Sequence, residues 1–112
     1  MQHILYRTYL RTLALYARLG QGAYAFYLSR RRGNLAGVDL SYLNLSGSNL
    51  TNGNLRDANL RYCDLKGVSL RGADLRGADL TAALVTQAQL DEAASLDGAI
   101  LPDGTVYVEV GR

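Results

Sequence analysis

From residue 35 to residue 80 the sequence places a leucine at every fifth position, and the same register continues through Val85 to Leu90. An α-helix rotates about 100° per residue, so five residues would turn each successive leucine by roughly 140° around the helix axis. In a strand, side chains alternate between two faces, and an odd spacing would put successive leucines on opposite sides of a sheet. Because neither element can bury the whole column, the chain must bend once per repeat to bring each side chain back to one interior. The predicted core is therefore Leu35, Leu40, Leu45, Leu50, Leu55, Leu60, Leu65, Leu70, Leu75, Leu80, Val85 and Leu90.

The residues around each leucine are typical of a chain that turns every five positions. Two positions before the leucine, from Gly33 to Ala88, nearly every side chain is small and none is charged, and Cys63 in this column is predicted to be a buried packing residue. Asparagine and aspartate dominate the position directly before the leucine, where their side chains hydrogen-bond nearby backbone and favour turns. Glycine recurs two positions after the leucine and supplies the positive φ that the third position of a type II turn requires. Leu43 in the small column and Leu84 in the outward column depart from the pattern and predict irregular packing.

Units such as ADLRG at 73–77 and ADLTA at 78–82 resemble the A(D/N)Lxx unit of the pentapeptide-repeat proteins, and twelve consecutive units occupy 33–92. The resemblance implies an all-β body, a right-handed quadrilateral parallel β-helix in which four repeats form one coil. Residues 33–92 would then form about three coils, spaced at about 4.8 Å like neighbouring strands, followed by an irregular C-terminal coil. The resemblance does not imply the imitation of duplex DNA that some members use to shield DNA gyrase, because this chain is short and slightly basic.

The last tier of a parallel stack exposes unpaired backbone and needs a cover against end-to-end association. After Leu90 the register slips by one residue, and the repeat resumes in the new frame. The slip predicts a bulge or one helical turn at 91–95. The Pro-Asp-Gly sequence at 102–104 predicts a turn, and the alternation of valine with tyrosine and glutamate at 106–110 predicts a strand. Residues 93–112 are therefore expected to form an irregular C-terminal cap that includes a strand.

Residues 1–32 contain six arginines and no acidic residue, although the chain as a whole carries a net charge of only +2. On a helical wheel, Arg7, Arg11 and Arg18 share one side of the segment 3–19, while leucine and tyrosine side chains occupy the other. The segment is predicted to be a basic amphipathic helix, with a second short helix after it. This N-terminal arm would either cap the first coil or dock on a partner. Every eighteen-residue window of the arm contains an arginine, so neither a spanning helix nor a signal peptide is expected.

The residue types that usually carry catalysis are scarce. The chain has one cysteine and one histidine, which excludes an intramolecular disulfide and a multi-histidine metal cage. No nucleophile stands beside a candidate base, and the aspartates fall in the outward turn column instead of a cluster. The sequence therefore predicts a protein that is not an enzyme, has no cofactor or metal and takes no small-molecule substrate. Without a disulfide framework the expected compartment is the cytoplasm, with a membrane-peripheral location as the alternative.

Three functions remain open, and all of them are binding functions. Tyr42 and Tyr62 are twenty residues apart, so in a coil of that length they would stack on the outside and receive the N-terminal helix or a partner. The first hypothesis is a protein–protein interaction or scaffold module, such as a small subunit of a larger assembly. The second is peripheral membrane attachment through the basic helix, and the third is nucleic-acid binding by the arginine-rich arm. The candidate interaction residues are Arg7, Arg11, Arg18, Tyr42 and Tyr62.

Overall fold

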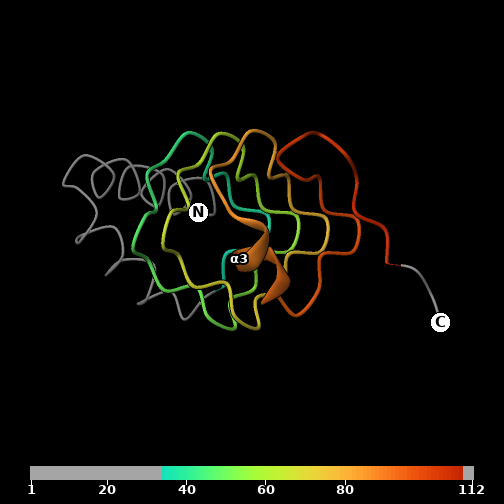
Figure 1. Ribbon diagram of the computed structural model, residues 1–112, viewed down its shortest axis with the longest axis horizontal. Coiled ribbons are helices and arrows are strands. Elements are labelled where there is room, and N and C mark those ends of the chain that lie inside the picture. Colours follow the sequence, from blue (N-terminus) through green and yellow to red (C-terminus); the bar gives the residue numbers. More distant parts are fainter. Residues whose placement is uncertain (1–33, 110–112) are drawn as a thin grey trace, which may run out of the picture.

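A computed structural model describes residues 34–109 and shows a chain that winds in stacked four-sided coils. Up to Leu84, isolated parallel bridges join residues that are 20 positions apart, in four columns. Each side of a coil contributes one bridged residue, because the chain turns again directly afterwards. In Figure 1 the successive coils lie side by side along the long axis, from green to red. The regular columns are Asn34–Asn54–Asp74, Asp39–Asn59–Asp79, Asn44–Asp64–Leu84 and Asn49–Ser69.

Each corner of a coil is a turn that the five-residue pattern explains. The leucine carbonyl accepts a hydrogen bond from the residue three positions later, as Leu60 does from Cys63 at 3.2 Å. The asparagine or aspartate before the leucine accepts a hydrogen bond from the backbone N–H two residues on, as Asn59 does from Arg61 at 3.2 Å. The third position of the turn has a positive φ, which suits glycines such as Gly67 at +69°. Five other residues adopt the same conformation: Tyr42, Asn52, Asp57, Tyr62 and Ala82.

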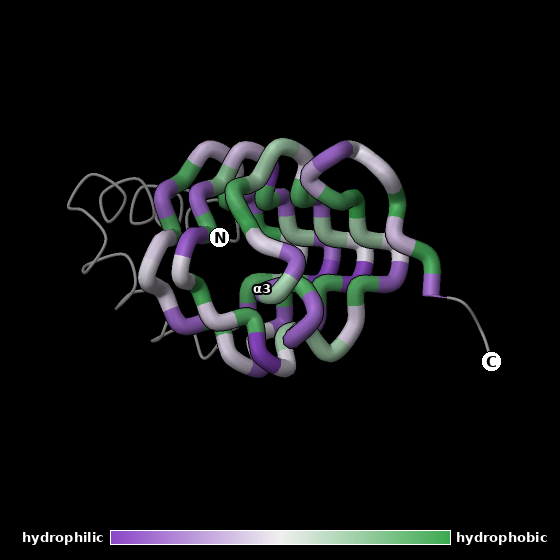
Figure 2. The backbone as a smooth tube through the Cα atoms, in the orientation of Figure 1, coloured by the Kyte–Doolittle hydropathy of each residue, from purple (hydrophilic) through white to green (hydrophobic). Residues whose placement is uncertain are grey.

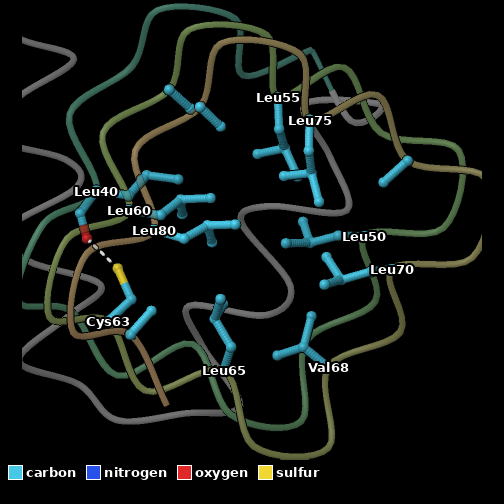
Figure 3. Packing of buried hydrophobic residues seen from close by; sticks show 14 of the residues in the cluster. Leu40, Leu50, Leu55, Leu60, Cys63, Leu65, Val68, Leu70, Leu75 and Leu80 are labelled. Atoms are coloured by element: carbon cyan, nitrogen blue, oxygen red, sulfur yellow. Dashed lines mark hydrogen bonds between the residues drawn. The ribbon is translucent and has the colours of Figure 1, made fainter. Parts of the chain in front are cut away.

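The leucine column fills the interior of the coils. The leucines of this column, at every fifth position from Leu35 to Leu80, are each at most 1% exposed. Figure 3 shows them pointing inward from the different sides, with Leu40 and Leu60 one above the other in successive coils. Along the backbone, hydrophobic and hydrophilic residues alternate around every coil (Figure 2). Because each buried leucine contributes about 1.5–3 kcal/mol by leaving water, this column is the main source of stability.

The regular stacking ends after Leu84, where helix α3 (Gln87–Asp91) takes the place of the next bridge. The helical turn predicted at 91–95 is therefore wrong in its position, since the helix lies about one turn earlier in the chain. It begins there because Thr86 and Gln89 form a capping box, with both reciprocal hydrogen bonds present. As the helix departs from the five-residue register, Val85 is only partly buried and Ala88, expected in the inward column, is exposed.

A side chain of helix α3 completes the hydrogen bonding of the coil below. Gln89 Nε2 donates to the carbonyl oxygens of Leu65 and Val68 at 2.7 and 2.9 Å. In the regular coils the equivalent bond comes from the backbone, as when Asn59 N donates to the Val38 carbonyl at 2.9 Å. The glutamine amide thus replaces a backbone N–H that the helix has withdrawn from the ladder.

Beyond helix α3 the bridges resume one position later, and two columns continue to Ser95 and Ile100, as the one-residue slip predicts. The predicted turn at 102–104 is present, and after it the chain reverses direction. Val106 then forms an antiparallel bridge with Ile100. Within the described residues, the strand expected at 106–110 consists of this single bridge.

Candidate interaction surface

Tyr42 and Tyr62 form a stacked pair on the outside of the coil. Their ring centroids are 4.8 Å apart and the ring planes differ by 4°. The backbone ladder holds them in adjacent coils, because Tyr42 N donates to Arg61 O and Tyr62 N donates to Thr81 O, both at 2.9 Å. Tyr42 is 73% exposed and Tyr62 is 48% exposed. The structure therefore brings together the two candidate interaction residues that the twenty-residue spacing places in one column, and it leaves both rings accessible.

Both tyrosines occupy the left-handed backbone conformation that glycine takes at other corners. The φ angle is +64° at Tyr42 and +59° at Tyr62. A side chain in this conformation costs about 1–2 kcal/mol, whereas a stacked aromatic pair is worth about 0.5–1.5 kcal/mol beyond its buried area. Because the strain of two corners is at least as large as the gain from one stack, the pair adds little net stability to the isolated protein.

The polar groups beside the rings are already paired within the protein. Ser41 donates its hydroxyl and its backbone N–H to Asp39 Oδ1 at 2.6 and 3.0 Å, and these hydrogen bonds lower the pKa of Asp39. In the adjacent coils, Arg61 Nε lies 3.8 Å from Asp79 Oδ2, and Thr81 Oγ1 donates to Asp79 Oδ1 at 2.6 Å. Since these polar groups already have hydrogen-bond or ion-pair partners within the protein, this part of the surface chiefly offers aromatic rings.

Cys63 is a buried, unreactive thiol. Its Sγ donates a hydrogen bond to the Leu40 carbonyl at 2.7 Å (Figure 3). Burial raises the pKa of the Cys63 thiol to about 11. The thiol is therefore protonated at neutral pH, and it lacks the thiolate character that a nucleophile or a metal ligand needs. Within residues 34–109 no group of three or more histidine, cysteine, aspartate or glutamate side chains is placed to hold a metal ion.

A hollow of about 450 Å³ opens where helix α3 leaves the coil register. Leu84, which the pattern places in an outward column, is 50% exposed at its edge. The outward position of Leu84 is readable in the sequence, whereas the hollow depends on the position of helix α3 and was not predicted. Its lining residues are Lys66, Gly67, Ala83, Leu84, Val85, Thr86 and Gln89.

Arg7, Arg11, Arg18 and the basic helix expected at 3–19 lie outside the described residues. Their role as a cap, or as a contact to a partner, therefore stays a prediction. In the part of the chain that the structure covers, no helix has the length and apolar character to cross a membrane.

Comparisons with known proteins agree with the repeat pattern. A family model of pentapeptide repeats matches in eight copies, over residues 34–72, 54–91 and 69–103. No curated protein matches the chain. Among solved structures, the chain is similar to HetL, a pentapeptide repeat protein involved in heterocyst differentiation regulation from the cyanobacterium Nostoc sp. strain PCC 7120.

The identity to HetL is 33% and the TM-score is 0.43. The match covers 66% of this chain and 43% of HetL, so the chain spans less than half of the HetL length. The family model, by contrast, spans well over half of the present sequence, and its matches coincide with the bridged coils and the leucine column. The chain therefore belongs to the pentapeptide-repeat family.

Proposed function

We propose that this protein is a non-catalytic protein–protein interaction module, in which the coils form a scaffold that presents the exposed tyrosine pair to a partner. Tyr42 and Tyr62 carry the proposal, because they are large, accessible and held in register by the backbone ladder. Tyrosine is enriched among the residues that contribute most to protein interfaces. A partner that covered both rings would supply the apolar burial that the isolated protein lacks at these corners.

The rigid backbone around the pair favours specific binding. Each tyrosine N–H donates to a carbonyl of the next coil, so the backbone that carries the rings is fixed, and the two rings stack on each other before a partner arrives. A preorganised contact loses less conformational entropy on binding than a flexible one. This supports the tyrosine pair as a contact surface rather than as an internal stabilising feature.

The domain boundaries are part of the same proposal. Residues 33–92 form the scaffold, 93–112 the C-terminal cap and 1–32 a basic arm that either covers the first coil or joins the interface. If the arm packs against the tyrosine pair, it competes with a partner for the two rings. If it extends the interface, its arginines add positive charge to an otherwise aromatic contact.

The experiment is affinity capture with the full chain and with the double variant Tyr42→Gly, Tyr62→Gly. Glycine removes both rings and also relieves the positive φ, so the variant is expected to fold at least as well as the natural chain. Ala82→Gly is the matched control, because it changes the same corner position in the next coil, where φ is +58°, without removing a ring. We expect the double variant to lose a partner that Ala82→Gly retains. An unchanged set of captured proteins would contradict the proposal.

The six arginines of the arm support two alternative functions, peripheral membrane attachment and nucleic-acid binding. Flotation with liposomes that contain anionic lipid tests the first, and titration with DNA or RNA at low salt tests the second. In both assays the variant with Arg7, Arg11 and Arg18 changed to glutamine is the comparison. Binding that needs these arginines, together with no effect of the tyrosine changes, would favour the arm over the tyrosine pair.

A further inference from the structure

The C-terminal end of the coils presents a short backbone edge with free hydrogen-bonding groups. The segment 105–109 runs back along the last coil: Leu101 N donates to Thr105 O at 2.7 Å, and Tyr107 N donates to Ala99 O at 2.7 Å. Backbone groups of successive residues in an extended segment point in opposite directions. The N–H and C=O groups of Val106 and Val108 therefore point away from the coil, and neither residue takes part in a hydrogen bond within residues 34–109.

The side chains along this edge are of two kinds. Val106 and Val108 are 57% and 69% exposed, and they lie on the outer face with Ile100, the bridge partner of Val106. Tyr107 points to the opposite face and lines a hollow of about 180 Å³ beside helix α3. An added extended segment would therefore have apolar contacts on its outer face and a partly open hollow beneath its inner face.

Two carboxylates stand at this hollow, those of Asp91 and Glu109. Each is held by one neutral donor: Gln87 Nε2 donates to Asp91 Oδ1 at 2.8 Å, and Ser95 Oγ donates to Glu109 Oε1 at 3.0 Å. Neither carboxylate has a salt-bridge partner within residues 34–109. The hollow is thus negatively charged, and hydrogen bonds from neutral side chains hold its two carboxylates in place.

The charge around the edge is predominantly negative. Between residues 77 and 109 there are six acidic residues and no lysine or arginine. The nearest preceding base, Arg76, is near enough to interact with Asp97 and Glu109, but its direct partner is Asp74, with Arg76 Nη2 and Asp74 Oδ2 2.8 Å apart. A second copy of this end would bring like charges together, whereas a basic segment would be attracted. The acidic residues are Asp79, Asp91, Glu92, Asp97, Asp103 and Glu109.

We propose that the Val106–Val108 edge binds an extended basic segment of a partner protein, as an added antiparallel or parallel strand with arginine or lysine side chains over the hollow between Asp91 and Glu109. The free backbone groups supply the pairing, the two valines pack against alternate apolar side chains, and the acidic surface selects a basic sequence. This site is separate from the tyrosine pair, and it does not depend on the function proposed above.

The test is fluorescence anisotropy of a labelled peptide, acetyl-(Val-Arg)4-amide, with the full chain. Val108→Pro is the backbone variant, because it removes an N–H that has no partner in the described residues. It should weaken binding at least about fivefold, since one edge hydrogen bond is lost and the approach of the peptide is hindered. The same peptide N-methylated at every second residue should not bind, because its pairing edge is blocked.

The charge variant is Asp91→Asn with Glu109→Gln, which keeps the oxygen atoms that accept from Gln87 and Ser95. It should weaken binding about tenfold at low salt, because two ion pairs are lost. Asp64→Asn is the matched control, since it removes one charge from a regular coil and Asn59 already makes the equivalent turn bond. This control should change binding less than about twofold.

Three results would overturn the proposal. The first is the absence of saturable binding, and the second is an equal loss for Asp64→Asn and the charge variant, which would show a general charge effect. The third is a dimer in sedimentation that Val108→Pro converts to a monomer, because a second copy would then occupy the edge. If Val108→Pro fails to fold by circular dichroism, the N-methylated peptide and the charge variant still decide the outcome.

Discussion

The regular coils at 34–84 and the C-terminal region at 85–109 solve the same problem in different ways. In the regular coils, backbone hydrogen bonds run in both directions between each pair of neighbouring coils, as when Leu40 N donates to Asn59 O and Asn59 N donates to Val38 O, so one five-residue unit can be repeated. In the C-terminal region the partners change: a glutamine side chain replaces a backbone N–H, and an antiparallel segment covers one stretch of the last coil. The stack therefore does not end by omission of a repeat. Other groups satisfy part of the last backbone, and the edge at Val106 and Val108 stays without a partner within residues 34–109.

The largest expected effect is on stability, and it should distinguish the buried leucine column of the coils from positions outside it. Leu60→Asp or Leu65→Asp places a carboxylate where the leucine is fully buried, and should cost about 4 kcal/mol or more, enough to unfold much of the protein. Leu84 lies outside the buried column and is 50% exposed. Leu84→Asn should therefore alter the free energy of unfolding by no more than about 0.5 kcal/mol. Urea denaturation followed by circular dichroism measures both. Similar losses at Leu60 and Leu84 would contradict the distinction.

A smaller effect is expected at the junction between the two regions. Gln89→Glu keeps the oxygen that accepts from Thr86 but replaces the amide that donates to the carbonyls of Leu65 and Val68. Leaving these acceptors without that donor, and facing them with a carboxylate, should cost about 2 kcal/mol. Gln87→Glu is the control in the same helix, because Gln87 is exposed and bonds only Asp91. Its cost should be about 0.5 kcal/mol, from repulsion with Asp91. Thermal unfolding of the two variants tests this prediction. Equal losses of stability would contradict the role of Gln89.

At the corners of the regular coils, a change from glycine to alanine should lower the stability of the protein, and a change from alanine to glycine should raise it. Gly47→Ala meets no atom within 4 Å but retains a φ of +79°, so it should cost about 1 kcal/mol. Ala82→Gly relieves a φ of +58° and should stabilise the protein by about 0.5 kcal/mol. Denaturant midpoints of the two variants provide the measurement. A loss of stability in both would mean that positive φ is not the controlling factor at these corners.

The smallest effect concerns pH. The hydrogen bonds from Arg76 lower the pKa of Asp74, and those from Thr105 lower the pKa of Asp103, on either side of the junction. A carboxyl group with a lowered folded-state pKa adds stability above its unfolded pKa, near 4, and loses it as the pH falls through the folded value. Asp74→Asn should therefore be less stable than the natural chain at pH 7, and the difference should shrink as the pH falls below about 4. Melting temperatures across this range check the sign, and a difference that grew toward acid pH would contradict it.

Much of the regular region could be predicted from the sequence because its contacts repeat. The five-residue period of leucine excluded both helix and flat strand, and the Asn or Asp before it and the glycine after it indicated the turns. The stack of Tyr42 on Tyr62 follows from the same arithmetic, since one coil is twenty residues long. Pentapeptide-repeat proteins form right-handed quadrilateral β-helices, and the four bridge columns agree with that architecture.

The irregular region was predicted less well, because local patterns compete there. The one-residue slip was visible after Leu90, yet helix α3 lies at Gln87–Asp91, before the slip is complete. A capping box and a tertiary bond from Gln89 to the preceding coil determine this position. The hollow beside Asp91 and Glu109 likewise forms from segments that meet only after the chain has reversed.

The sequence by itself determined that this protein is a coil with a leucine interior and a corner every five residues, because a strict period leaves one way to keep those side chains dry. Only the tertiary structure decided how the coil ends, which tyrosine faces stay open and which backbone edge is free. Those features depend on which donors and acceptors remain unpaired after the coils have stacked and the C-terminal segment has folded back, and that is set by contacts between neighbouring coils and by the return of 105–109 along the last coil.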